Sequence, residues 1–169
     1  MSSNYLTLNP SKTEFLLIGL PQHTSKIVNP SRSLPSIKPI MTSLPAKNLG
    51  FIFDSTLSFS KQISSLSSAC HYHIRNLRRI RHIVDFTNAT TIATALVHSR
   101  FNYCNSRYHG LPITQIKRLQ HIQNGLAQAI TRTPKHLHIS LVLKFLNWLI
   151  VEQWIQYKII YITHNIIHN

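Results

Sequence analysis

Acidic side chains are scarce in this sequence. Its 169 residues include 4 Asp and Glu against 18 Lys and Arg, which gives a formal net charge of +14 at pH 7 with histidine neutral. The acids are Glu14, Asp54, Asp85 and Glu152, and the nearest two along the chain are Asp54 and Asp85. Two-metal phosphoryl transfer, glycoside hydrolysis and calcium binding each need clustered carboxylates. The sequence therefore argues against all three, and it predicts neither a resident metal nor a cofactor.

Cysteine and long apolar runs are also scarce. Two cysteines exclude a disulfide-rich secreted scaffold. The N-terminus has no basic stretch that leads into an apolar run, so no secretory signal is predicted. No apolar run approaches the roughly 18 residues that are typical of a spanning helix. We therefore expect an intracellular protein, cytoplasmic or nuclear, that is not secreted and has no transmembrane segment.

The two cysteines have histidine neighbours, which raises the question of zinc. Cys70 precedes His71 and His73, and Cys104 precedes His109. Structural zinc sites usually have tighter spacings in loops. Cys70 also falls on an apolar helical stripe, where a free cysteine behaves as a small hydrophobe. The sequence therefore favours a buried, unligated cysteine over a zinc site. The four glycines form no nucleotide-binding loop, and no nucleophile motif is present.

The pattern of hydrophobic residues changes near residue 58. Before it lie most of the prolines and two short apolar runs, 15–18 and 48–53, which predict strands. The Ser- and Pro-rich stretch between them predicts one or two edge strands around 27–28 and 37–41. After residue 58 the spacing becomes helical. We expect an α+β fold, with a small antiparallel sheet fragment in residues 1–57 and a mainly α-helical part of about five helices in residues 58–169.

Each expected helix has an apolar stripe. The first runs from Ser58 toward Val84, the second starts from a cap at Thr87 or Asn88, and the third follows Pro112 with Thr114 as its cap. A fourth helix is expected at 140–146 and a fifth at 151–167. The residues expected to face inward are Ile63, Leu66, Cys70, Ile74, Leu77, Ile80 and Val84; Ala89, Ile92, Ala93 and Leu96; Ile116, Leu119, Ile122, Leu126 and Ile130; and Val151, Ile155, Ile159, Ile162 and Ile166.

The strongest local feature is the basic stretch HIRNLRRIRHI at 73–83. Like charges stacked on a helix repel by a few tenths of a kcal/mol per pair, and no acid lies in the stretch to relieve them. Neutralisation by phosphates would relieve them and would give sequence-independent, salt-sensitive binding. A weaker basic site is Lys117-Arg118. The predicted nucleic-acid-binding residues are Arg75, Arg78, Arg79, Arg81, Lys117 and Arg118. The alternative is a solvated helix face.

Aromatic residues near the C-terminus have two possible roles, in binding or in the core. Trp148, Trp154, Tyr157 and Tyr161 are suited to stacking on nucleobases. An aromatic stripe at helical spacing is more often core, and the sequence favours that reading.

Several segments, taken in order, resemble one known family. They are LNPSKTEFLLIG (8–19), NLGFIFDSTLSFSKQI (48–63), HIRNLRRIR (73–81), TIATALVHSRFNYCNS (91–106), LPITQIKRLQHIQNGLAQAITRTPK (111–135) and LNWLIVEQ (146–153). Together they resemble the C-terminal part of the reverse transcriptase of LINE-type, jockey-like non-LTR retrotransposons. The resemblance covers nearly the whole chain and corresponds to the end of the palm plus the thumb.

This resemblance implies a role for each half of the chain. Residues 8–57 would be the last palm strands and residues 58–169 a thumb-like helical part. Lys12 sits where the family has its motif D lysine, near the incoming triphosphate. Leu49 and Gly50 sit in the motif E turn, which grips the primer end. The family's metal-binding aspartates include an Asp-Asp pair, and no such pair occurs in this sequence. We therefore expect a truncated RNA-directed DNA polymerase fragment that is no enzyme on its own.

The expected partner is the backbone of RNA or DNA, and no small-molecule substrate is expected. Two alternatives stay open. The chain is suited to be a helical module that docks on a protein partner or an anionic membrane, with self-association through exposed apolar surface. It is equally compatible with a non-functional product of a decayed element.

Overall fold

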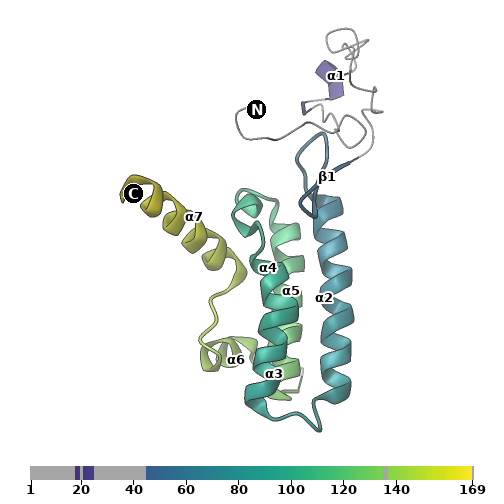
Figure 1. Cartoon of the computed structure of the whole chain (residues 1–169), viewed down its shortest axis with the longest axis vertical. Coiled ribbons are helices and arrows are strands. Elements are labelled where there is room, and N and C mark those ends of the chain that lie inside the picture. Colours follow the sequence, from purple (N-terminus) through teal and green to yellow (C-terminus); the bar gives the residue numbers. More distant parts are fainter. Residues whose placement is uncertain (1–17, 20, 25–44, 135–136, 169) are drawn as a thin grey trace, which may run out of the picture. The chain divides into compact units, whose positions relative to one another are not determined.

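The computed structural model of the chain describes residues 18, 19, 21–24, 45–134 and 137–168 (Figure 1). Contacts divide the chain into two compact units, residues 1–62 and 63–169. The strands expected at 27–28 and 37–41 lie outside the described residues, as do Lys12 and most of the run 15–18. The expected division between residues 57 and 58 stays a prediction.

The first unit contains a β-hairpin. Helix α1 (Pro21–Thr24) precedes strands β1 (Ala46–Asn48) and β2 (Phe51–Phe53), which pair antiparallel with Asn48 opposite Phe51. Leu49 and Gly50 have φ values of 48° and 85°, as in the two-residue turns whose twist matches a hairpin. The single strand expected over 48–53 is therefore wrong, because Gly50 accepts the positive φ that reverses the chain.

An acid organises the segment between β2 and α2 (Ser60–Ile80). The Asp54 carboxylate accepts hydrogen bonds from the backbone N–H groups of Ser58 (3.0 Å) and Phe59 (2.9 Å). It also accepts from the hydroxyls of Ser58 (2.6 Å) and Thr56 (3.0 Å). Partial burial works to raise the pKa of Asp54, but the hydrogen bonds outweigh it and leave the pKa below its ordinary value.

The second unit is helical. After α2 come α3 (Phe86–Ala93), the π-helical turn η4 (Thr94–His98) and α4 (Ser99–Asn102), which form one continuous helix. The turn η5 (Asn105–Tyr108) leads to α5 (Ile113–Thr131), α6 (Ile139–Phe145) and α7 (Val151–His168). Helices α2 and α5 run in the same direction, and the helix from α3 to α4 runs opposite to them (Figure 1). The expected α+β class is confirmed: the described residues form a small antiparallel sheet and, after residue 58, five helices when α3 to α4 are taken as one.

Two expected helix caps are wrong. The N-cap of α3 is Asp85, whose Oδ1 accepts from the Asn88 N–H at 3.3 Å, so neither Thr87 nor Asn88 serves as the cap. Helix α5 begins at Ile113, so Thr114 lies inside its first turn. The Pro112 carbonyl accepts the N–H of Gln115 at 2.9 Å. Each helix thus starts at an earlier residue than the cap pattern suggested.

Most of the expected core is buried, and the exceptions have local causes. Ile63, Leu66, Cys70, Ile74 and Leu77 of α2 are buried, as are Leu119, Ile122, Leu126 and Ile130 of α5. Ile80 is 38% exposed because α2 ends there, and Leu96 is 42% exposed. The π turn widens the helix locally, so that buried residues follow in steps of four. Val97 and Phe101 therefore continue the buried stripe of Ala89 and Ala93.

Within the described part of the chain, the fully buried residues of α7 lie in its first turns. Val151 and Ile155 are buried, whereas Ile162 and Ile166, expected inside, are 37% and 74% exposed. Among the helices that the structure describes, none has both the length and the hydropathy that crossing a bilayer requires.

Candidate nucleic-acid interface

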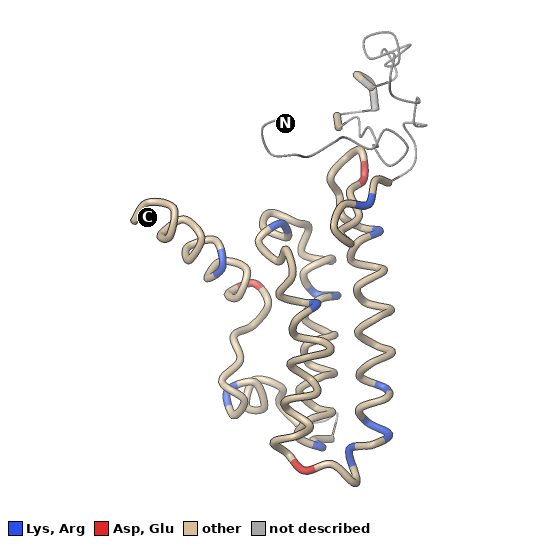
Figure 2. The backbone as a smooth tube through the Cα atoms, in the orientation of Figure 1, with Lys and Arg blue, Asp and Glu red and all other residues tan. Residues whose placement is uncertain are grey.

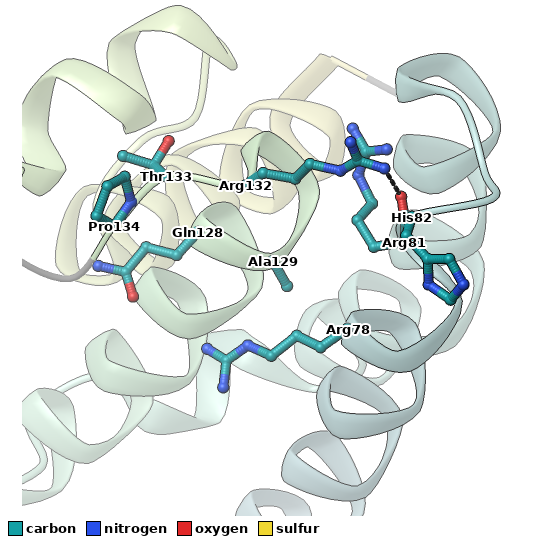
Figure 3. A pocket seen from close by; sticks show the side chains of 8 residues that line it. All are labelled: Arg78, Arg81, His82, Gln128, Ala129, Arg132, Thr133 and Pro134. Carbon is teal, nitrogen blue, oxygen red and sulfur yellow. Dashed lines mark hydrogen bonds between the residues drawn. The ribbon is translucent and has the colours of Figure 1, made fainter.

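The C-terminal ends of α2 and α5 border a basic hollow of about 450 Å³ (Figure 3). The residues that line it come from the last turns of both helices and the segments just after them. They are Arg78, Arg81, His82, Gln128, Ala129, Arg132, Thr133 and Pro134. Sequence analysis predicted two of these, Arg78 and Arg81, as nucleic-acid contacts.

Arg81 is the buried arginine of this group, with 9% of its surface exposed. Its Nε donates to the carbonyl of Ile130 at 2.7 Å, and its Nη1 donates to the carbonyl of Val84 at 2.5 Å. The carbonyls in the last turn of a helix have no partner within the helix. Arg81, which follows α2, thus caps the end of α5.

Arg132 makes a hydrogen bond in the opposite direction, from the end of α5 toward the end of α2. It ends α5 with a φ of 56°, a conformation that glycine usually supplies at helix ends. Its Nη2 donates to the carbonyl of Arg81. Arg81 therefore bonds the last turn of α5, and Arg132 bonds the residue that follows α2; we call Arg81 and Arg132 the arginine clamp.

The hollow keeps a positive charge after this capping. Two helix C-termini carry about −0.5 each, or roughly −1 together. Arg78, Arg81 and Arg132 contribute three positive charges, and no carboxylate is among the described residues that line the hollow. The net charge around the hollow is therefore roughly +2. An anionic group would therefore be attracted to the hollow, although the helix dipoles weaken that attraction.

The exposed arginines extend this positive surface along α2. Arg75, Arg78 and Arg79 are exposed and stand at i, i+3 and i+4, the spacing that places side chains on one helix face. Arg78 makes one long hydrogen bond, from Nη2 to the Gly125 carbonyl at 3.3 Å. Figure 2 shows the cluster of cationic positions toward the end of α2. Arg75, Arg78 and Arg79 form what we call the α2 basic face.

Lys117 and Arg118 do not join this surface. Both are exposed in the first turns of α5, whereas the hollow lies at its last turns. Arg118 donates to Gln115 Oε1 at 3.1 Å and to Ser64 Oγ at 3.2 Å. They therefore form a separate basic spot near the start of α2.

Sequence reasoning missed Arg132. A signal for it exists, since Pro134 marks a helix end and basic residues are favoured in the last turn of a helix. What the sequence did not contain was the position of α2 beside α5, where the carbonyl of Arg81, the residue after α2, receives the Arg132 guanidinium.

The cysteines do not form a metal centre in the part of the chain that is described. Cys70 is fully buried, and burial raises the pKa of its thiol to about 11, partly offset by Arg100. A metal ligand must be the thiolate. Within the described ranges, no three His, Cys, Asp or Glu side chains gather to hold an ion.

The residues implied by the family resemblance fall elsewhere. Leu49 and Gly50 form the hairpin turn of the first unit, with Leu49 85% exposed, and their role at a primer end stays a prediction. Lys12 lies outside the described residues.

Comparisons with known proteins returned no match: no family model, no curated protein and no solved structure resembles this chain closely enough to count.

Replacing Arg81 with alanine should destabilise the helical unit. Each hydrogen bond from a charged donor contributes about 1.5–3 kcal/mol, so we expect Arg81→Ala to lower the free energy of unfolding by about 2–4 kcal/mol. Arg79→Ala, an exposed neighbour, should change it by less than about 0.5 kcal/mol. Urea unfolding of both variants measures this difference. Equal losses would mean that Arg81 does not join the helix ends.

Proposed function

We propose that this chain is the end-of-palm and thumb part of an RNA-directed DNA polymerase from a LINE-type, jockey-like non-LTR retrotransposon. In this proposal it binds the backbone of RNA or DNA and does not polymerise on its own. The collinear sequence segments support the family. The α2 basic face beside the cationic hollow is the observation that carries the binding function.

The geometry of the α2 basic face suits a phosphodiester strand. A helix rises about 1.5 Å per residue, so Arg75 and Arg79 lie about 6 Å apart along the axis. Successive phosphates of one B-DNA strand advance about 3.4 Å, so the face spans about two phosphates. Helix α2 contains no acidic residue, and phosphates would supply the missing negative charge.

The acids of the described residues support the absence of catalysis. Asp54 is held by hydrogen bonds in the turn before α2, Asp85 caps α3, and Glu152 lies in the first turn of α7. These three carboxylates belong to different elements. Two-metal phosphoryl transfer needs carboxylates that converge on ions about 3.5–4 Å apart. This spread of the described carboxylates supports the proposal that the chain does not join nucleotides.

The purified chain should incorporate no nucleotide on a primed RNA template with Mg²⁺ or Mn²⁺. The reason is the lack of converging carboxylates. A gel-based primer-extension assay measures this. Extension that disappears in Asp85→Asn would contradict the proposal, since it would place an acid of this chain in the reaction.

Binding of an RNA–DNA hybrid should depend on the α2 basic face. At fixed low salt, the variant Arg75→Gln/Arg78→Gln/Arg79→Gln should bind roughly tenfold or more weakly, because each arginine neutralises part of the phosphate charge. Fluorescence anisotropy of a labelled hybrid measures the affinity. The matched control is Lys61→Gln/Lys144→Gln/Lys158→Gln, which removes the same charge from exposed or half-exposed positions elsewhere. If both variants lose affinity equally, binding follows total charge and not this face.

A second candidate is a module that docks on a protein or an anionic membrane. It is favoured by the outer turns of α7, where Ile160, Ile166 and Ile167 are 68%, 74% and 71% exposed. Flotation with anionic vesicles separates the two candidates. Flotation that the hybrid does not compete away would favour α7 as the functional surface, and binding to neither would favour a non-functional product.

A further inference from the structure

A second hollow of about 200 Å³ lies between η4, the α6–α7 connection and the start of α7, and it shares no lining residue with the basic hollow. Aromatic rings form its walls: the imidazole of His98, the indoles of Trp148 and Trp154, and the phenol of Tyr157. None of the lining residues that the structure describes is Lys, Arg, Asp or Glu. Its chemistry therefore differs from that of the hollow beside the arginine clamp.

Several of the aromatic rings around this hollow contact one another. The centroid of His98 lies 4.3 Å from that of Trp148 and 4.7 Å from that of Trp154, with interplanar angles of 31° and 41°. Trp154 in turn stacks on Phe101 at 5.8 Å and 13°. A planar ligand that entered the hollow would find aromatic faces beside it, although these faces are tilted relative to one another.

The floor of the hollow is held in place by glutamines. Gln123 is 3% exposed, and its Nε2 donates to the Leu149 carbonyl at 2.8 Å. Gln120 donates to Gln123 Oε1 at 2.9 Å and accepts the Val151 N–H, also at 2.9 Å. These bonds attach the α6–α7 connection to α5, so the hollow exists without a ligand to form it.

One polar atom at this site lacks a partner. His98 Nε2 is buried and has no hydrogen bond in the structure. Burial lowers the pKa of His98 to about 4, so the ring is neutral near pH 7. A neutral imidazole offers a donor at one nitrogen and an acceptor at the other. A buried polar atom without a partner is unfavourable, and a ligand with a polar edge would relieve it.

We propose that this aromatic hollow, made by His98, Trp148, Trp154 and Tyr157, binds a nucleobase. Its volume exceeds the roughly 150 Å³ of an apolar cavity that takes up benzene, which suits one or two fused rings. A plain apolar ring would leave His98 Nε2 unpaired. A nucleobase carries donors and acceptors side by side on its edge, so it pairs with either tautomer of His98. The base comes either from a free nucleoside or from an unpaired position of a strand.

This site does not depend on the α2 basic face. None of its lining residues is an arginine or a lysine. The variant Arg75→Gln/Arg78→Gln/Arg79→Gln should therefore keep the affinity for a nucleoside, which makes failure of this inference distinguishable from failure of the proposed function.

The two tryptophans of the chain both line this hollow, so both indoles respond to a ligand that enters it. We expect adenosine, added to the full chain, to shift the fluorescence and both indole N–H resonances in a saturable way. Tyr157→Ala should weaken binding roughly tenfold, because it removes one stacking surface. Tyr157 is 56% exposed, so the fold should persist. Tyr72→Ala, on α2 and 59% exposed, is the matched control, since Tyr72 is not among the residues that line the hollow, and it should bind as the parent does.

Toluene serves as the apolar comparison. His98→Leu should lose adenosine while it still takes up toluene. No saturable shift with adenosine, or toluene and adenosine binding equally well to the parent chain, would overturn the proposal. Oligoadenylate and the same strand with abasic sites distinguish the source of the base. Tighter binding of the intact strand than of adenosine indicates an unpaired base, and equal binding indicates a free nucleoside.

Discussion

The arginines at the ends of α2 and α5 hydrogen-bond to backbone carbonyls, and the helical unit depends on that choice of partner. With only four acids in the sequence, carboxylates are not at hand to pair these guanidinium groups. The ends of two helices that run in the same direction provide an alternative, because their last carbonyls are unpaired and carry partial negative charge. Arg81 bonds the end of α5 and Arg132 bonds the residue after α2. Because acids are scarce, these arginines bond to backbone carbonyls instead, and the bonds join the two helices.

The same shortage determines what is left on the surface. The helix ends offset only about one unit of charge at the clamp. Arg75 and Arg79 stay exposed on α2, and the helix holds no acid. Pairs of exposed opposite charges contribute little to stability, so their absence costs the fold little. The consequence lies in binding, since a chain with this charge balance attracts polyanions. The capping arginines therefore hold the helices together, and the remaining arginines give the surface its positive charge.

Hydrophobic spacing was sufficient to place the helices and to identify much of the core, because burial of one face follows directly from the helical period. It failed where geometry departs from the ideal. Leu49 and Gly50 turn the chain inside an apolar run, and the π turn at 94–98 moves the buried stripe from Leu96 to Val97.

The sequence showed the basic stretch at 73–83, but it did not show that its arginines have different partners. Arg81 is buried and Arg79 is exposed because α5 ends beside Arg81. The spacing of residues along α2 carries no information about where α5 ends. His98 was missed for the same reason, since Trp148 and Trp154 reach it from another part of the chain.

The central claim is that cationic side chains without carboxylate partners bind a phosphodiester backbone. The salt dependence of hybrid binding by the unmodified chain tests it most directly. The logarithm of the binding constant should fall linearly with the logarithm of salt concentration. Its slope should be about −2 or steeper, as expected for the release of counterions from at least two or three phosphates. A slope near zero would contradict the claim, because affinity would then come from contacts other than the charges.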